Sequence, residues 1–292
     1  LGSVIHPDRL VRLADLFQGR PRLTVAALLA APLGWLVIGY LGSLGVMLVA
    51  SFWHLNELSG EVTQGFSLDN YDVLFTDEVY RTIAMRTIGI AAAVTVTDVI
   101  LAFPIAFYMA KVAKPRMQSL LVVAVLLPLW SSYLVKVGAW RLMLSEDGVI
   151  NWALEPFGLH GPGYGTAAVW LVMSYMWLPY MIIPIYAGLE RIPDSILSAS
   201  EDLGAKPWRT FRKVILPMSF PAVVAGSIFT FSLTLGDYIT PANVGTKQFI
   251  GNVVYSNFVS NLPLAAAITT IPIVVMVIYL LVARKLGAFD HV

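Results

Sequence analysis

Cysteine is absent from the sequence, which excludes disulfides, thiolate metal ligands and cysteine nucleophiles. Charge is also scarce: 13% of the 292 residues are charged, against about a quarter in soluble proteins. By contrast, 58% of the residues are hydrophobic and the mean hydropathy is +0.75. This composition predicts a membrane protein, and a net charge of only +1 argues against a nucleic-acid partner.

Recognisable metal, catalytic and targeting patterns are missing as well. The four histidines show no H-E-x-x-H spacing, so no metal site is predicted; they are His6, His54, His160 and His291. No paired nucleophile and base occurs at membrane depth, which argues against an intramembrane enzyme. The basic segment 9–22 lacks the apolar core and cleavage site of a secretory signal, so none is predicted there.

The sequence does contain long, charge-poor apolar runs. A bilayer core about 30 Å thick requires about 20 apolar residues per spanning helix. The runs lack the alternation of a barrel, and backbone groups in hydrocarbon need internal hydrogen bonds, so helices are predicted. The expected fold is an all-α polytopic membrane protein with about six transmembrane helices, at 23–53, 82–110, 117–135, 166–189, 217–236 and 263–283. Six prolines in these runs are expected to kink their helices: Pro104, Pro128, Pro179, Pro184, Pro221 and Pro272.

Lysine and arginine collect in alternate loops, and this predicts the orientation because short cytoplasmic loops carry the excess of these residues. The basic set comprises Arg9, Arg12, Arg20, Arg22, Lys111, Lys114, Arg116, Arg191, Lys206, Arg209, Arg212, Lys213, Arg284 and Lys285. The opposite loops are acidic, with Glu57, Glu61, Asp69, Asp72, Asp77, Glu78, Glu146, Asp147 and Glu155. Both termini are therefore predicted to be cytoplasmic, as tails at 1–22 and 286–292 that flank one transmembrane domain at 23–285.

The cytoplasmic loop between the fourth and fifth spans is long and predicts two short helices within 194–216. Asp194 is placed to cap the first helix, Gly204 to take a left-handed conformation at its end, and Pro207 to begin the second. Pro217 is expected to end the second helix. An aromatic face of that helix, formed by Trp208 and Phe211 with Ile215, is expected to meet a protein partner.

This loop carries a family resemblance. Its sequence Ser198-Ala199-Ser200-Glu201-Asp202-Leu203-Gly204-Ala205, followed by Val214-Ile215-Leu216-Pro217, resembles the EAA loop of binding-protein-dependent ABC permeases. The family pattern is E-A-A, three residues, G, nine residues, I-x-L-P. Ser198 stands in place of the family's Glu and Ser200 in place of its second Ala; Glu201, one turn from Ser198, is a candidate to replace the missing carboxylate.

Other segments extend the resemblance over nearly the whole chain. The segment Phe66-Ser67-Leu68-Asp69-Asn70-Tyr71 resembles one in spermidine and putrescine permeases, as do Leu127-Pro128-Leu129-Trp130 and Ile250-Gly251-Asn252-Val253-Val254. Permeases for ferric iron, thiamine, phosphonates and opines share much of this layout. The resemblance therefore implies an importer permease, with polyamines as the first choice of solute and these other solutes as alternatives.

The resemblance implies a type I ABC importer permease fold in the bacterial inner membrane, with this chain as a non-catalytic half of the translocation path. Its implied partners are an ABC ATPase dimer, a second permease subunit that is expected to be a paralogue, a periplasmic or lipid-anchored substrate-binding protein, and membrane lipid. No Walker A pattern occurs here, so no cofactor is expected in this chain, and ATP and magnesium would bind to the ATPase subunits. The residues expected to couple to the ATPase are Ser198, Ala199, Ser200, Glu201, Asp202, Gly204, Ala205, Trp208, Arg209 and Phe211.

A polycationic solute would need carboxylates and aromatic faces along its path. Asp98 is the only charged residue between Arg86 and Lys111, near the middle of the second span, and Asp237 lies at the end of the fifth. Aromatic candidates for the path are Trp130, Tyr133, Tyr175, Trp177 and Tyr238. Two alternatives remain: Asp98 forms a structural ion pair with Lys136 or Arg86, or the chain is an independent secondary transporter in which Asp98 and Lys136 relay charge.

Overall fold

A computed structural model describes residues 21–56 and 59–286 of the chain. Most of both predicted tails therefore lies outside the described residues, together with His6, His291, Glu57 and the arginines at 9, 12 and 20. The described elements, in order, are α2 Pro21–Trp35, η1 Leu36–Leu41, α3 Gly42–Ala50, β1 His54–Leu55, β2 Val62–Thr63, α4 Asp69–Thr76, α5 Glu78–Phe107, η2 Tyr108–Val112, α6 Pro115–Leu126, η3 Leu127–Trp130, α7 Tyr133–Met143, α8 Val149–Leu154, η4 Glu155–Phe157, α9 Thr166–Glu190, α10 Asp194–Asp202, α11 Pro207–Thr210, η5 Phe211–Ile215, α12 Leu216–Gly236, α13 Ile239–Val244, α14 Ile250–Ser260 and α15 Leu262–Lys285.

Five described helices are long and apolar enough to cross a membrane, and a bent helix pair raises the number to six if it counts as one span. The five are Leu28–Ala50, Glu78–Val112, Thr166–Glu190, Pro207–Gly236 and Leu262–Lys285. The prediction of an all-α polytopic membrane protein with about six spans is confirmed. Besides its helices, the described part of the chain forms a short antiparallel hairpin of β1 and β2.

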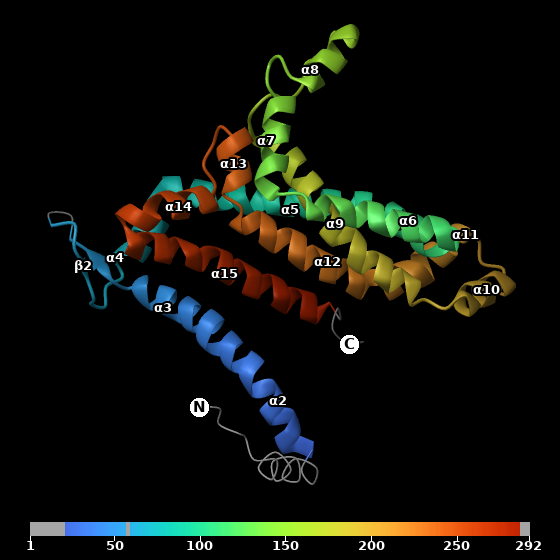
Figure 1. Cartoon of the computed structure of the whole chain (residues 1–292), viewed down its shortest axis with the longest axis horizontal. Helices are drawn as coiled ribbons and strands as arrows, with labels where there is room; N and C mark the ends of the chain where they lie inside the picture. Colours follow the sequence, from blue (N-terminus) through green and yellow to red (C-terminus); the bar gives the residue numbers. More distant parts are fainter. Residues whose placement is uncertain (1–20, 57–58, 287–292) are drawn as a thin grey trace, which may run out of the picture.

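The centre of the molecule is a bundle in which α5, α9 and α12 pack on one another, with α15 beside α12 (Figure 1). Close approach of α9 and α12 depends on small residues. A side chain at Gly188 would collide with Ala222, and one at Gly226 with Met181. Such contacts matter in a membrane, where lipid is as apolar as leucine and helices associate through close van der Waals contact.

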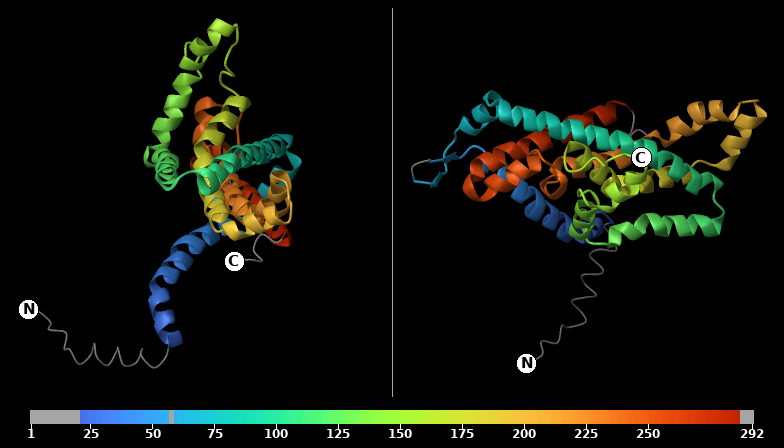
Figure 2. Two further views of the ribbon diagram at one scale, coloured as in Figure 1. Left: turned by 90° about the vertical axis from the view of Figure 1, so that its right-hand side faces the viewer. Right: turned by 90° about the horizontal axis from the view of Figure 1, so that it is seen from above.

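The bundle has two distinct ends, which Figure 1 places on opposite sides of the molecule. At one end α10, α11 and η5, residues 194–215, form a bent projection that we call the elbow. The other end holds α4, α14 and the hairpin, and we call it the α14 end. α2 diverges from the bundle, and the α7–α8 arm stands off another side (Figure 2).

The third predicted span, 117–135, is not a straight helix. The segments Pro115–Trp130 and Tyr133–Met143 meet at 90°. Beyond the break, Ser131 Oγ donates to the carbonyl of Pro128 at 2.8 Å and Lys136 Nζ donates to the same carbonyl at 3.1 Å. The backbone N–H of Ser131 donates to the same carbonyl at 3.3 Å, so three donors meet at the end of the interrupted helix. The other five prolines predicted to kink helices lie inside continuous ones.

Two details predicted for the loop at 194–216 are wrong. Pro217 does not end a helix, because α11, η5 and α12 form one helical segment from Pro207 to Gly236. Proline has no backbone N–H, so one helical hydrogen bond is missing at Pro217. The π-helical turn Phe211–Ile215 directly before it allows the helix to continue without that bond. Asp194 does not cap α10: it is the first helical residue and its carboxylate accepts from Lys111 instead.

Candidate functional site

The elbow is anchored to the bundle by a lysine from another span. Lys111, at the end of η2, donates to the carbonyl of Ile192 at 2.6 Å and to Asp194 Oδ1 at 3.0 Å. The lysine side chain is mostly buried whereas that of Asp194 is exposed. These bonds link the start of α10 to the end of α5–η2.

The turn of the elbow depends on one glycine and one hydroxyl pair. Gly204 has φ +74°, a conformation that costs other residues about 1–2 kcal/mol, as its position in the sequence predicts. Across the turn, Ser200 Oγ and Thr210 Oγ1 are 2.8 Å apart and hydrogen-bonded. Ser200, which replaces an alanine of the family pattern, therefore ties α10 to α11.

The elbow presents most of the predicted coupling residues to solvent. Ser198, Ala199, Glu201, Asp202, Gly204, Trp208 and Arg209 are exposed, and Ser200, Ala205 and Phe211 are partly so. The predicted aromatic face is exposed only at its tip, because Trp208 is 68% exposed whereas Ile215 is buried. Phe211 lies between Trp208, on which it stacks at 5.5 Å, and Phe103 of α5, which it meets edge-on at 5.6 Å.

A cavity of about 790 Å³ opens beside this aromatic stack, between α5 and the elbow. Glu201, Pro207 and Trp208 line it from the elbow, and Phe103 and Phe107 line it from α5. A protruding tryptophan beside a groove is the kind of surface that anchors protein partners.

Asp98 is fully buried, and neither oxygen of its carboxyl group has a hydrogen-bond partner among the described residues. The predicted ion pair is absent there, because Lys136 bonds the carbonyl of Pro128 and Arg86 donates to the carbonyl of Gln248 at 2.8 Å. A direct relay between Asp98 and Lys136, as an independent transporter would need, has no support in these contacts. Three further buried polar atoms lack partners within the described chain: Ser174 Oγ, Trp177 Nε1 and Thr230 Oγ1.

At the α14 end of α12, four of the seven predicted path residues line one cavity of about 340 Å³: Tyr133, Trp177, Asp237 and Tyr238. The hydroxyl of Tyr133 donates to Asp237 Oδ2, and its ring stacks on Trp177 at 5.8 Å. Asp237 Oδ1 accepts from the amides of Ile239 and Thr240 at 2.9 and 3.2 Å. A half-buried carboxylate thus lies in one cavity with three aromatic side chains.

The remaining path candidates lie elsewhere. Trp130 is 91% exposed at the bend before α7, and Tyr175 packs on Trp140 at 5.3 Å. Sequence reasoning missed Thr240, whose hydroxyl lies 2.7 Å from that of Tyr133, and Ser232, which lines the cavity. Nothing in the local sequence of either residue marks it as part of a site.

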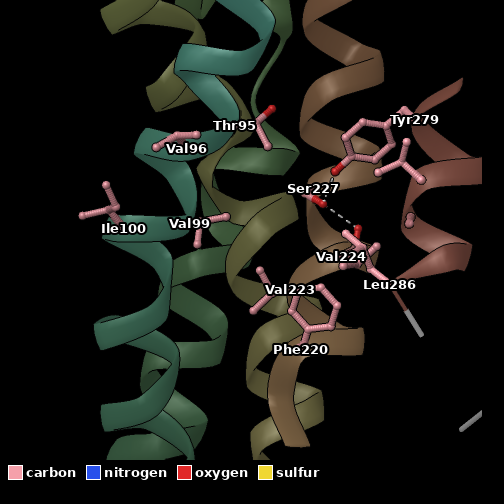
Figure 3. Close-up of a pocket in the computed structure, with 12 residues that line it drawn as sticks. Thr95, Val96, Val99, Ile100, Phe220, Val223, Val224, Ser227, Tyr279 and Leu286 are labelled. Carbon is pink, nitrogen blue, oxygen red and sulfur yellow. Dashed lines mark hydrogen bonds between the residues drawn. The ribbon is translucent and has the colours of Figure 1, made fainter. Parts of the chain in front are cut away.

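A further cavity of about 330 Å³ lies between α5, α12 and α15, nearer the elbow (Figure 3). Thr95, Ser227 and Tyr279 contribute hydroxyl groups to its lining. The hydroxyls of Ser227 and Tyr279 are 2.6 Å apart. With no carboxylate in its lining, this cavity is poorly suited to a cation.

Comparison with known proteins places this geometry in a family. Residues 84–288 match the model of the binding-protein-dependent transport system inner membrane component. The chain is 44% identical to the Escherichia coli inner membrane ABC transporter permease protein YdcU, over 96% of this chain and 95% of the relative. It is 28% identical to the spermidine/putrescine transport system permease protein PotB of Salmonella typhimurium, over 85% of this chain and 88% of the relative.

Solved structures agree on the fold. A subunit of a bacterial ABC transporter that imports the acidic polysaccharide alginate, solved with a pentasaccharide-bound periplasmic protein, superposes with a TM-score of 0.67 at 18% identity, over 93% of this chain and 96% of that one. At this identity the likeness concerns the fold alone. The family match, by contrast, spans the bundle, the elbow and the Asp237 cavity, and the chain belongs to the inner membrane components of binding-protein-dependent transport systems, the ABC permeases.

Proposed function

We propose that this chain forms half of the translocation path of an ATP-driven importer and that the elbow docks into an ATPase subunit. The observation that carries the proposal is the elbow itself. It projects from one end of the bundle, carries the family motif on exposed residues, and ends in the exposed ring of Trp208. Lys111 ties its first helix to α5, so a force on the elbow would reach a membrane span.

The elbow end is proposed to be cytoplasmic. Basic residues gather on the elements of this end, including Lys111, Lys206, Arg212 and Lys285, whereas Asp69, Asp72, Asp77 and Glu78 belong to elements of the α14 end. The excess of lysine and arginine on the cytoplasmic side of membrane proteins supports this orientation. With an even number of spans, both tails would then be cytoplasmic.

The partners follow from this orientation. An ABC ATPase dimer that binds ATP and magnesium would contact the elbows of two permease subunits, and a substrate-binding protein would deliver the solute at the α14 end. α2 offers a surface for the second permease, which we propose to be a paralogue: Leu28, Leu33 and Trp35 are exposed although they lie in or beside a span. The candidate span that contains them is therefore available for contact with a helix of another subunit.

A polyamine is the proposed solute. The cavity at the α14 end sets the Asp237 carboxylate among the rings of Tyr133, Trp177 and Tyr238. An ammonium group is attracted by both a carboxylate and an aromatic face. The name of the PotB relative, a spermidine/putrescine permease, supports the same solute class. A phosphonate would be repelled by the carboxylate.

Purification of the complex from membranes tests the docking role. Trp208→Ala is expected to lower the recovery of the ATPase about tenfold, since a tryptophan at the centre of an interface typically contributes 2 kcal/mol or more, on the order of tenfold or greater in affinity. Trp152→Ala is the matched control, because Trp152 is 73% exposed on α8, away from the elbow. Equal recovery of the ATPase with both variants, or purification of the wild type without any ATPase, would contradict the proposed importer role.

The solute is tested with the reconstituted complex and its binding protein. Spermidine and putrescine are expected to stimulate ATP hydrolysis and to be taken up, whereas ferric iron, thiamine, a phosphonate and an opine are expected to have no effect. Stimulation by one of these four instead would leave the permease role intact and replace the polyamine.

A further inference from the structure

A separate cavity, of about 1000 Å³, lies at the α14 end between α3, α4, α5 and α15. Its walls are apolar at membrane depth, where Leu48 of α3, Ala84 of α5 and Val275 of α15 all belong to candidate spans. Apolar cavities do not hold water well, because water needs polar partners. An apolar ligand therefore fits this lining better than water does.

The rim of this cavity differs from its walls, because it carries one charge of each sign. Asp72 of α4 and Arg81 in the first turns of α5 both line the cavity. The guanidinium of Arg81 is 4.0 Å from Glu78, with both side chains largely exposed, which is a weak contact. Asp72 has no ion pair within the part of the chain that the structure describes. Both charges are free to bind a ligand.

Tyrosines mark the level of the rim. Tyr71 and Tyr80 line the cavity next to the two charged residues, and the hydroxyl of Tyr71 is fixed by Ser51 at 2.7 Å. Tyrosine is enriched where the hydrocarbon core meets the head groups. The cavity therefore runs from head-group level into the hydrocarbon core.

We infer that this cavity holds the acyl chain of a phospholipid with a phosphoethanolamine head group, with the phosphate at Arg81 and the ammonium at Asp72. The acyl chain matches the apolar walls, and the two charges of the head group match Arg81 and Asp72 at the rim. An anionic lipid without an ammonium would leave Asp72 facing a phosphate. A choline head group carries no N–H, so it cannot donate a hydrogen bond to the carboxylate. Because lipid tails gain little on moving from bilayer to protein, selectivity depends on the head group.

Native mass spectrometry of the assembled transporter tests the inference. The complex is equilibrated in nanodiscs of equal phosphatidylethanolamine and phosphatidylcholine with identical chains, then released, and the retained lipids are counted. The wild type is expected to retain phosphatidylethanolamine over phosphatidylcholine by about tenfold, the effect of one charge-assisted hydrogen bond. Asp72→Asn should reduce that preference to near one, and Arg81→Gln should lower retention of both lipids.

Two tryptophan substitutions on α15 supply a matched pair. Val274 and Val277 are similarly exposed, at 54% and 50%, but only Val274 lines the cavity. Val274→Trp fills the space and should remove the retained lipid, whereas Val277→Trp should retain it as the wild type does. Equal retention by the two variants would overturn the inference, as would a wild type that holds both lipids equally. Loss of the second permease with Val274→Trp, and no retained lipid in the wild type, would assign the cavity to the subunit interface instead.

Discussion

Asp237 has both carboxylate oxygens engaged by its own chain, by the hydroxyl of Tyr133 on one side and by two backbone amides on the other. These bonds hold the carboxylate in place and leave its charge in the cavity. Asp237→Asn keeps the acceptor for the amides but removes the charge. Polyamine uptake is expected to fall about tenfold or more through a raised KM, since a charge-assisted contact is stronger than a neutral one.

The control for this substitution is Asp147→Asn, in the exposed turn between α7 and α8. Tyr133→Phe is a second variant, because it loosens the carboxylate without removing its charge and should give a smaller rise in KM. Uptake kinetics with labelled putrescine measure all three variants. An unchanged KM for Asp237→Asn would exclude this cavity from the path.

Asp98 presents the opposite situation, since its carboxyl group is buried without a partner among the described residues. An unpaired polar group in such a place costs about 1–3 kcal/mol of stability. Asp98→Leu keeps the branched shape and the number of side-chain heavy atoms, and is therefore expected to raise the free energy of unfolding by about that amount and the melting temperature of the purified protein. If Asp98 also serves transport, uptake will fall although stability rises.

Thr95→Val is the comparison for Asp98, because Thr95 is buried about one turn away and its hydroxyl is bonded to the carbonyl of Ala91 at 2.7 Å. Removal of this satisfied hydroxyl should lower stability by about 1 kcal/mol and leave uptake unchanged. Wild-type uptake in Asp98→Leu would remove Asp98 from the path, and a lower melting temperature would contradict the unpaired carboxyl group.

For single residues, the sequence predicts burial in the bundle better than it predicts hydrogen-bond partners. The position of Asp98 in a charge-free run predicts that it faces protein or water, and it is buried. The contact of Tyr133 with Asp237 joins residues 104 apart in the chain, so no local pattern contains it. Lys136 lies close enough in sequence to Pro128 to bond its carbonyl, but only the bend before α7 brings the two groups together.

At the scale of helices, the two helices of the elbow are joined by a hydrogen bond that an alanine at position 200, as in the family pattern, could not make. The hydroxyl pair of Ser200 and Thr210 joins α10 to α11 and contributes about 1 kcal/mol. Ser200→Ala restores the alanine of the family pattern but removes this bond. ATP hydrolysis is expected to continue while solute uptake per ATP falls severalfold, since the elbow would transmit motion less rigidly.

Ser195→Ala provides the matched control, because Ser195 is exposed on the same helix and makes no hydrogen bond through its side chain in the described structure. Uptake and hydrolysis are measured together in proteoliposomes. If Ser200→Ala transports as many solute molecules per ATP as Ser195→Ala does, the hydroxyl pair has no part in coupling.

The sequence predicts helices well where charge is absent, but it does not predict what a given proline does to its helix. The runs at 166–189 and 263–283 fall within α9 and α15. Pro128 and Pro217 behave in opposite ways: one lies just before a 90° bend, and the other lies inside a continuous helical segment after a π-helical turn. The local rule is the same for both residues. Their difference lies in the neighbouring backbone, which breaks after Trp130 in one case and forms a π-helical turn before Pro217 in the other, and the sequence pattern marks neither feature.

Across the whole molecule, basic residues gather at the elbow end of the bundle and acidic residues at the α14 end. Because the sequence has no cysteine, single introduced cysteines can show which end faces the cytoplasm. Single cysteines at Ala199 on the elbow and at Lys247 between α13 and α14 would each be the only thiol in the chain. Both positions are exposed, so their thiols should react at similar rates with an impermeant maleimide wherever the reagent has access. A difference in labelling therefore reports the side of the membrane.

Lys247→Cys is expected to be labelled in intact spheroplasts and Ala199→Cys only in inside-out vesicles, because the basic end of a membrane bundle faces the cytoplasm. Inside-out vesicles that still carry the ATPase should protect Ala199→Cys, and removal of the ATPase should restore its labelling. Detergent-solubilised protein without the ATPase is the control, in which both cysteines should react. Labelling of Ala199→Cys in spheroplasts would place the elbow outside the cell, where no ATP-hydrolysing subunit could reach it, and the coupling role would have to be abandoned.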